Sequence, residues 1–334
     1  MSAFVLEAPA SRMLAVQITR HGGPEVLTLA QVPTPQPGPG QVLVRVRASC
    51  INPRDWLLRQ GRYVFRFVLG RFPIIPGSDI AGEVVALGRG VSQWQIGARV
   101  FGMQPINGRM GAYAQYVAIS AAALAAMPDN VSFEQAAAVP CAGLTAWDAL
   151  HSIGKLQPGM RVLINGAAGG VGSYALQLAK AHGAQVVAVC SAANADWARQ
   201  MGADEVLDYR AGPLQPAGGA VDIFFDAVGR SSLDKSQHLL RPGGRYITTI
   251  PSLPNLQQSL RGAVLRRLRP ATAKTSHMVL VRAFGANLQA MARLMAAGKL
   301  RSEIEQIYPL AEVAQAQQRS QSWHVRGKLV LQLP

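Results

Sequence analysis

The sequence predicts an α/β protein in which a β-rich part is joined to a doubly wound parallel sheet. Up to about residue 130, short segments of alternating apolar and polar residues are separated by Gly and Pro, as is typical of half-buried strands. From residue 160 to about 300, strongly apolar strands alternate with helical patterns, which favours a parallel sheet covered by helices. The chain of 334 residues is 49% hydrophobic and 15% charged, so it can bury the core of one large or two ordinary domains.

The first part contains strands and a connection that can be neither helix nor central strand. The connection is "VPTPQPGPGQ" at 32–41, whose prolines and glycines exclude both. A helix is expected over 130–150, because Ser132 is a candidate N-cap and Gln135 stands at the capping-box position. The strands are expected at 13–20, 41–49, 81–88 and 114–120.

The second part repeats a strand followed by a helix. Strands are expected at 161–166, 185–191, 221–229, 243–250 and 277–283, with helices at 171–183, 194–202 and 231–240. One more helix at 311–322 and a strand at 328–333 close the sequence.

The stretch "INGAAGGVGS" at 164–173 lies between an apolar strand and a helix, the context that a dinucleotide fingerprint requires. Its glycines allow a tight turn, close approach of a pyrophosphate and close packing of the helix on the strand. Ala167 replaces the first glycine of the strict motif, and a plain tight turn is the alternative. We expect the cofactor to contact Ala168, Gly169, Gly170, Val171 and Gly172, next to the positive end of the helix dipole.

Charge and cysteine content restrict the partners. The net charge of +15 is spread along the chain, with one basic cluster at 261–270 and no basic run interleaved with aromatic residues, so nucleic-acid binding is not expected. The three cysteines are scattered, which favours a reducing compartment. The apolar run at 118–127 is too short to span a membrane, and the N-terminus lacks signal-peptide features. We expect a cytoplasmic protein.

The region "NGAAGGVGSYALQLAKAHGAQVVAV" resembles the medium-chain dehydrogenase/reductase superfamily, especially its zinc-independent, zeta-crystallin-like quinone oxidoreductases. The resemblance extends over nearly the whole chain, through "GGPEVL" at 22–27, "INPRD" at 51–55, "PGSDIAGEV" at 76–84, "AGLTAWDAL" at 142–150, "GADEVLDY" at 202–209 and "RGKLVL" at 326–331. It implies a GroES-like catalytic domain over 1–131 and 300–334 and a Rossmann NADP-binding domain over 132–299. It also implies an active site in the cleft between the domains and a homodimer through the sheet edge.

The resemblance also implies residues of the catalytic site. Asn52 matches the family's cleft asparagine near the nicotinamide ribose and substrate, although it could only form an Asn-Pro turn. Asp55 could orient a donor or relay a proton, or be an exposed acid in a first helical turn. Relatives have a tyrosine shortly after this motif, where this chain has Trp56 and Leu57, so Tyr63 is the nearest substitute.

Further residues are expected at the cofactor. Thr145 matches a family hydroxyl near the nicotinamide, or bonds its own helix backbone. Val228, in the "DAVG" that ends a strand, could pack against the cofactor. The strand at 185–191 ends in Ser191 without a carboxylate, and Tyr209 matches a tyrosine of NADPH-using relatives, so NADPH is expected rather than NADH. Ala193 stands about where many relatives have Lys or Arg.

The resemblance implies no metal. Where zinc-dependent relatives have Cys, His and Cys as catalytic ligands, this chain has Asn52, Ser78 and Cys141. One thiol cannot form a three-ligand zinc site, so no zinc is expected. Without a Lewis acid, the reaction suits acceptors that take hydride readily, namely quinones or α,β-unsaturated carbonyl compounds. An enoyl or enone C=C reductase and a non-catalytic NADPH-binding sensor or structural protein are the alternatives.

Residues 255–268 combine a basic cluster with apolar residues at helical spacing, among them Leu256, Leu260, Val264 and Leu268. We expect a surface helix that covers the cleft or the dimer edge. A basic amphipathic helix of this kind could instead contact an anionic membrane surface.

Overall fold

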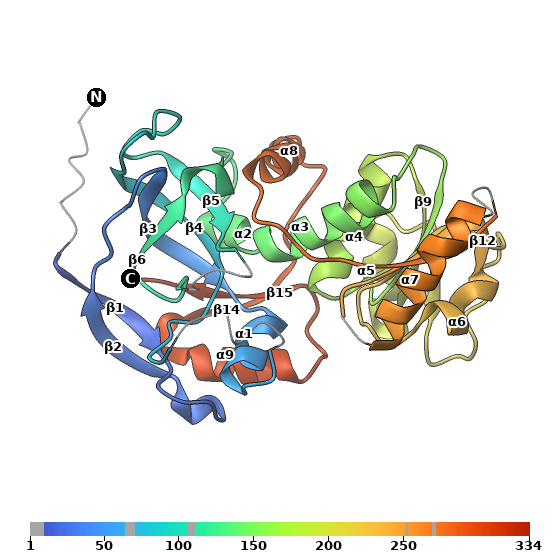
Figure 1. Cartoon of the computed structure of the whole chain (residues 1–334), viewed down its shortest axis with the longest axis horizontal. Coiled ribbons are helices and arrows are strands. Elements are labelled where there is room, and N and C mark those ends of the chain that lie inside the picture. Colours follow the sequence, from blue (N-terminus) through green and yellow to red (C-terminus); the bar gives the residue numbers. More distant parts are fainter. Residues whose placement is uncertain (1–9, 64–70, 106–110, 251–252, 269–271) are drawn as a thin grey trace. The chain divides into compact units, whose positions relative to one another are not determined.

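The computed structural model describes residues 10–63, 71–105, 111–250, 253–268 and 272–334 (Figure 1). The chain forms two compact units: unit 1 contains residues 1–144 and 282–334, and unit 2 contains residues 145–281. The predicted α/β class, with a β-rich domain and a parallel nucleotide-binding sheet, is confirmed. The predicted domain boundaries were 131/132 and 299/300. The two compact units divide at 144/145 and 281/282, and α8 (Gly285–Ala296) packs against β7 (Leu124–Ala126) within unit 1.

Unit 1 is a largely antiparallel sheet built from both parts of the sequence. Its strand order is β14-β15-β3-β4-β5-β7, and β6 also pairs with β3. Val330 of β15 is paired with Cys50 of β3, so the late strand reaches the end of the early one. The strands are β1 (Arg12–Gln17) and β2 (Thr28–Pro33), which pair with each other, and β3 (Gln41–Cys50), β4 (Asp79–Leu87), β5 (Arg99–Met103), β6 (Tyr116–Ser120), β14 (Ile304–Pro309) and β15 (Lys328–Gln332).

Helices α1 (Pro53–Arg59) and α9 (Val313–Gln321) pack against each other in unit 1 (Figure 1). The helix predicted over 130–150 is instead two helices, α2 (Phe133–Ala137) and α3 (Pro140–Trp147), followed by a wider helical turn at Asp148–Ile153. Pro140 explains the break, because it lacks an N–H and restricts the residue before it. The predicted capping box is confirmed: Ser132 accepts a hydrogen bond from the Gln135 N–H, and the Gln135 side chain accepts one from the Ser132 N–H.

Unit 2 is a six-stranded parallel sheet with the order β10-β9-β8-β11-β12-β13. After β8, the chain adds β9 and then β10 on one side of that strand. It then crosses to the other side of β8 and adds β11, β12 and β13. The adjacent carboxyl ends of β8 and β11 therefore form the switch point at which open α/β sheets bind ligands. The strands are β8 (Arg161–Asn165), β9 (Gln185–Cys190), β10 (Glu205–Asp208), β11 (Val221–Asp226), β12 (Leu240–Thr248) and β13 (Thr275–Met278), and the helices are α4 (Gly170–Ala181), α5 (Ala195–Gln200), α6 (Leu233–Ser236) and α7 (Leu253–Leu268).

Helix α7 presents its apolar residues outward. Its Gly262 lies so close to β13 that an added Cβ would be 3.3 Å from the Thr275 Cα. On the other side, Leu256, Leu260 and Val264 are 45%, 64% and 59% exposed. The side chain of Leu268 lies outside the described residues. A search of the described helices finds none that is long and apolar enough to cross a bilayer.

Candidate functional site

The loop between β8 and α4 has the geometry of a phosphate-binding turn. Gly166 adopts a φ of +79°, which favours glycine. A Cβ on Gly172 would lie 2.1 Å from the Gly166 carbonyl oxygen, so α4 can approach the turn only with glycine at this position. A Cβ on Gly169 would meet only the Gly166 oxygen, at 3.3 Å, which leaves room for a ligand. Helix α4 has twelve residues, and the first N–H groups of a helix have no partner within it.

The turn after β11 is fixed beside this loop by Asp226. Its Oδ1 accepts hydrogen bonds from Asn165 Nδ2 at 2.9 Å and from the Gly229 N–H at 2.9 Å. Its Oδ2 accepts from Tyr246 Oη at 2.9 Å. Asp226 is therefore a structural residue that ties β8, β11 and β12 together at the switch point. The turn brings Val228 against the loop, since a Cβ on Gly166 would lie 2.5 Å from Val228 Cγ2.

These residues fit the pyrophosphate and adjoining sugars of a nicotinamide dinucleotide. The backbone at Gly169–Gly172 offers donors beside a positive helix end, and the glycines leave space for close approach. Ala168 is buried, and Val228 supplies an apolar contact at the neighbouring strand end.

The carboxyl ends of β9 and β10 bring two of the predicted cofactor residues together. Asp208 is paired in register with Cys190, so Tyr209 and Ser191 follow at neighbouring strand ends. Tyr209 is 51% exposed, and the Arg210 Cζ lies 5.4 Å from the centre of its ring. The Asp208 Oδ1 accepts the Arg210 N–H at 2.9 Å. Arg210 thus places an exposed positive charge beside Tyr209. Ala193, about where many relatives have Lys or Arg, carries no charge.

A buried polar cluster in unit 1 gathers at Asn52, the N-cap of α1. Asn52 Oδ1 accepts from Lys328 Nζ at 2.7 Å, and Asn52 Nδ2 donates to Asp79 Oδ2 at 2.9 Å. The other Asp79 oxygen accepts the Cys141 N–H at 3.0 Å. Asn52, Asp79 and Lys328 are 3%, 0% and 4% exposed, so the amide is held between a buried carboxyl group and a buried ammonium group.

Burial affects the protonation of this cluster. It raises the pKa of Asp79 to about 6, a rise that the Lys328 ammonium opposes. Burial also lowers the pKa of Lys328, but its electrostatic interactions with Cys50 and Asp79 more than compensate, so this pKa lies above its usual value. Lys328 therefore stays an ammonium at neutral pH.

Asp55 lies beside Asn52 and is fully buried, so its interpretation as an exposed first-turn acid is wrong. Its Oδ2 accepts from the Asn52 N–H at 2.8 Å and from Tyr113 Oη at 2.7 Å. Burial raises the pKa of the carboxyl group, against the effect of the Arg54 charge and of these hydrogen bonds. Asp55 thus closes the capping box of α1 and has Tyr113 as a partner.

The remaining predicted residues lie in different surroundings. Tyr63 is half-buried in unit 1, with the Arg54 Cζ 5.7 Å from its ring centre, and burial raises its pKa. Thr145 is buried within α3. The fold brings Asn52 and Asp55 together in unit 1, and it brings the glycine loop together with Val228 in unit 2.

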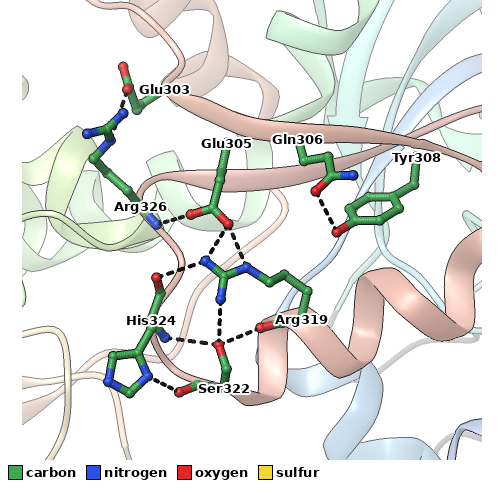
Figure 2. Close-up of polar contacts among 8 residues, drawn as sticks. All are labelled: Glu303, Glu305, Gln306, Tyr308, Arg319, Ser322, His324 and Arg326. Carbon is green, nitrogen blue, oxygen red and sulfur yellow. Dashed lines mark hydrogen bonds and ion pairs between the residues drawn. The ribbon is translucent and has the colours of Figure 1, made fainter.

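The loop that leads from α9 into β15 is held by a network of polar contacts (Figure 2). Arg319 Nε donates to Glu305 Oε1 at 2.7 Å, and the Arg326 N–H donates to Glu305 Oε2 at 2.7 Å, so one β14 carboxylate holds both sides of the loop. Ser322 Oγ accepts from Arg319 Nη1 at 3.1 Å (Figure 2). This network fixes where β15 begins, and therefore where Lys328 enters the buried cluster.

The positions that would hold a catalytic zinc do not fit this metal. The Asn52 amide is hydrogen bonded to Asp79 and Lys328, and Ser78 Oγ lies 3.4 Å from Asp79 Oδ1 as a donor. Cys141 is then the one sulfur ligand among these three positions, and one thiol does not make a three-ligand zinc site. Within the described part of the chain, no three His, Cys, Asp or Glu residues are grouped as a metal would need.

Several residues of these sites were not predicted from the sequence. Lys328 and Asp79 were not identified, although a lysine at the start of the apolar "KLVLQL" strand was a signal. Arg54 and Arg210 adjoin the predicted Asp55 and Tyr209 and were overlooked as well.

The fold and the loop together define a two-unit dehydrogenase of the kind that binds a nicotinamide dinucleotide. Residues 38–129 match the model of the alcohol dehydrogenase GroES-like domain, and residues 201–331 match that of the zinc-binding dehydrogenases. The chain is 33% identical to "Quinone-oxidoreductase QR1, chloroplastic" of Triphysaria versicolor, covering 96% of this chain and 98% of the relative. It is 32% identical to the mitochondrial NAD(P)H oxidoreductase RTN4IP1 of Mus musculus, covering 88% and 82%.

A solved structure is also similar. The quinone oxidoreductase from Coxiella burnetii superimposes with a TM-score of 0.85 at 31% identity, covering 97% of this chain and 100% of that one. The chain belongs to the medium-chain dehydrogenase/reductase superfamily, in its zeta-crystallin-like quinone oxidoreductase branch. It is an oxidoreductase with a nicotinamide cofactor.

Proposed function

We propose that this protein transfers hydride from NADPH to a quinone or an α,β-unsaturated carbonyl compound without zinc. The observation that carries the proposal is the buried Asn52–Asp79–Lys328 network, because it engages both ends of the Asn52 amide, which stands where zinc-dependent relatives have a metal ligand. Without a Lewis acid, the acceptor must delocalise the charge that hydride brings. The printed names of the relatives point to quinones as one such class.

In the proposed mechanism, unit 2 binds the cofactor and unit 1 positions the acceptor. Bound NADPH supplies the hydride. The loop at Gly169–Gly172 binds the pyrophosphate through backbone N–H groups, and Val228 packs beside it. In unit 1, Asn52 is held in one orientation by Lys328 and Asp79 and contributes to the place where the acceptor meets the nicotinamide. Catalysis then depends mainly on positioning and on exclusion of water.

Asp55 and Tyr63 complete the proposed acceptor site, and Thr145 the cofactor site. Asp55 has one oxygen, Oδ1, that is buried and has no hydrogen-bond partner among the described residues. That oxygen supports a part for Asp55 in orienting the acceptor or passing a proton.

The test of this function is NADPH oxidation with a series of quinones and enones, repeated with NADH and with a chelator. We expect turnover that resists the chelator and prefers NADPH. A conjugated C=C bond reduced faster than any quinone would favour the enone reductase instead. Tight NADPH binding without turnover on any acceptor would favour the non-catalytic NADPH-binding protein.

The preference for NADPH rests on Ser191, Tyr209 and Arg210. No carboxylate follows β9 to bind ribose hydroxyls, and Arg210 offers a charged donor for the 2′-phosphate beside Tyr209. We expect Arg210→Ala to raise the KM for NADPH about tenfold, in line with one lost charge-assisted contact, and to leave the KM for NADH unchanged. Arg199→Ala is the control, because Arg199 is already paired with Asp196 at 2.7 Å. Equal effects of Arg210→Ala on both cofactors would contradict this assignment.

Helix α7 supports a second proposal, contact with an anionic membrane surface. Three apolar side chains are exposed on it, and Arg261 and Arg267 are exposed as well. We expect Leu260→Ser combined with Val264→Ser to lower co-sedimentation with phosphatidylglycerol vesicles several-fold. Gln257→Ala, at an exposed polar position of the same helix, should leave it unchanged. Equal sedimentation of all three proteins would exclude this contact.

The homodimer and the cytoplasmic location stay predictions. Strand β13 is at the edge of the described sheet, which is where the resemblance implies that a dimer forms.

A further inference from the structure

Arg54 is a buried cation whose guanidinium nitrogens have no hydrogen-bond partner among the described residues. It is the second residue of α1 and is 7% exposed, yet Nε, Nη1 and Nη2 have no hydrogen-bond partner among the described residues. A guanidinium group has five N–H donors, and a buried charge that is left unpaired destabilises the fold. Other buried arginines are bonded: Arg59 Nε donates to Gln317 Oε1 at 2.7 Å, and Arg161 Nη2 to Glu205 Oε2 at 2.5 Å.

The surroundings of Arg54 leave its donors available. The guanidinium Cζ lies 5.7 Å from the centre of the Tyr63 ring, which can support the flat face of the group but takes none of its in-plane N–H donors. Asp55, the next residue, uses its Oδ2 for Tyr113 Oη and for the Asn52 N–H. Within the described part of the chain, the Asp55 Oδ1 likewise has no hydrogen-bond partner, so it does not accept from Arg54. The first turn of α1 therefore carries the guanidinium donors of Arg54 and a carboxylate oxygen of Asp55, and neither has a hydrogen-bond partner among the described residues.

The charge of Arg54 acts on Asp79 and on Cys141, the second of which stands where zinc-dependent relatives have a metal ligand. Burial raises the pKa values of Asp79 and Cys141, and the positive charge of Arg54 opposes both rises. The guanidinium thus lies close enough to influence the cluster around Asn52. A positive group at this place supplies, by hydrogen bonding, some of the charge stabilisation that a metal supplies elsewhere.

We propose that the Arg54 guanidinium binds the carbonyl oxygen of the acceptor and stabilises the negative charge that this oxygen gains on reduction. The inference rests on the proposed function. Hydride, with its electron pair, passes from NADPH to the acceptor, and the cofactor leaves as NADP⁺. The carbonyl π electrons move onto the oxygen, which becomes an oxyanion held by the Arg54 N–H donors. A proton taken up from water then neutralises this oxyanion.

The test compares Arg54→Gln, Arg54→Lys and Arg54→Met with wild type in the full chain. We expect Arg54→Gln to lower kcat for the best acceptor by 10²-fold or more, as for loss of an oxyanion donor, with an unchanged Kd for NADPH. Arg54→Lys should restore part of the rate. Arg62→Gln is the control, because Arg62 is exposed a few residues further on and should turn over as wild type does. Wild-type kcat in Arg54→Gln would overturn the proposal.

Two readouts do not depend on turnover. The anion of 2-hydroxy-1,4-naphthoquinone is a stable analogue of the charged oxygen, and its binding should weaken at least tenfold in Arg54→Gln and Arg54→Met. Thermal unfolding of Arg54→Met should occur at the same temperature as wild type or higher, because an unpaired buried charge is removed. A large fall in unfolding temperature would show a structural arginine and overturn the assignment. If the wild-type protein reduces no acceptor, the proposed function is wrong. If the naphthoquinone anion binds equally to wild type and to Arg54→Gln, the Arg54 site is wrong as well.

Discussion

Replacing Lys328 by methionine is expected to lower the free energy of unfolding by about 3–5 kcal/mol at pH 7.5, the range for breaking a buried ion pair. The Lys328 ammonium is 4% exposed and donates to Asn52 Oδ1 at 2.7 Å, while the same amide donates to Asp79. Methionine fills much of the volume but leaves the Asp79 carboxylate buried without a compensating charge. Denaturant unfolding measures the loss.

The loss of unfolding free energy caused by Lys328→Met should increase as the pH rises. Burial raises the pKa of Asp79 to about 6 in the folded protein, above the value near 3.9 of an unfolded aspartate. The folded state therefore binds this proton more tightly. The resulting stability, about 3 kcal/mol for about two pKa units, is fully present below pH 4 and is lost as the pH rises through 6. Without Lys328 the pKa rises further, so the cost of Lys328→Met should be largest at pH 8 and smaller at pH 5.

Two further variants make this prediction specific. Lys180→Met removes a partly exposed lysine that pairs with Asp204 at 2.8 Å, and it should cost no more than about 1 kcal/mol. Adding Asp79→Asn to Lys328→Met removes the uncompensated charge and should recover part of the stability and abolish the pH dependence. A Lys328→Met protein as stable as wild type at pH 8 would contradict a functioning ion pair.

Gly172→Ala is expected to weaken NADPH binding about 100-fold or more and to destabilise unit 2. The added Cβ would be 2.1 Å from the Gly166 carbonyl oxygen and 2.8 Å from the Ala167 Cα, so backbone must move, and such overpacking costs about 1–3 kcal/mol. The movement displaces the loop that binds the pyrophosphate. Fluorescence titration gives the Kd for NADPH, and thermal unfolding gives the stability.

Gly169→Ala is the matched variant in the same loop. Gly169 has a φ of −79°, which alanine tolerates, and its added Cβ would contact only the Gly166 oxygen at 3.3 Å. We expect near wild-type unfolding but weaker NADPH binding, because the methyl group occupies space that the phosphates approach. Unchanged Kd values in both variants would show that the dinucleotide binds elsewhere.

Local features were predictable from the sequence because neighbouring residues determine them. The strand, the glycine loop and the helix at 161–183 follow from apolar periodicity and from the conformational freedom of glycine, and the Ser132 capping box spans three residues. Pro140 was visible in the sequence as well, but alanines on both sides of it favour helix, and one continuous helix was predicted.

The buried cluster was not predictable, because it depends on long-range packing. Lys328 and Asn52 are 276 residues apart in the chain, and no local pattern indicates that they meet. The burial of Arg54 likewise depends on which elements cover α1. Helix α7 was predicted, but the sequence could not tell which of its faces meets β13, since that depends on the close approach at Gly262.

The interleaving of unit 1 has a consequence for biosynthesis. Unit 2 is one continuous stretch, 145–281, whereas unit 1 requires β15, whose Val330 pairs with Cys50. When the ribosome has synthesised residues 145–281, the strand that pairs with β3 has not yet been made, so Asn52 and Asp79 lack Lys328 at that stage. The nucleotide-binding unit can therefore fold while the nascent chain is still being made. The proposed acceptor site can be assembled only after residues 328–332 have been synthesised as well.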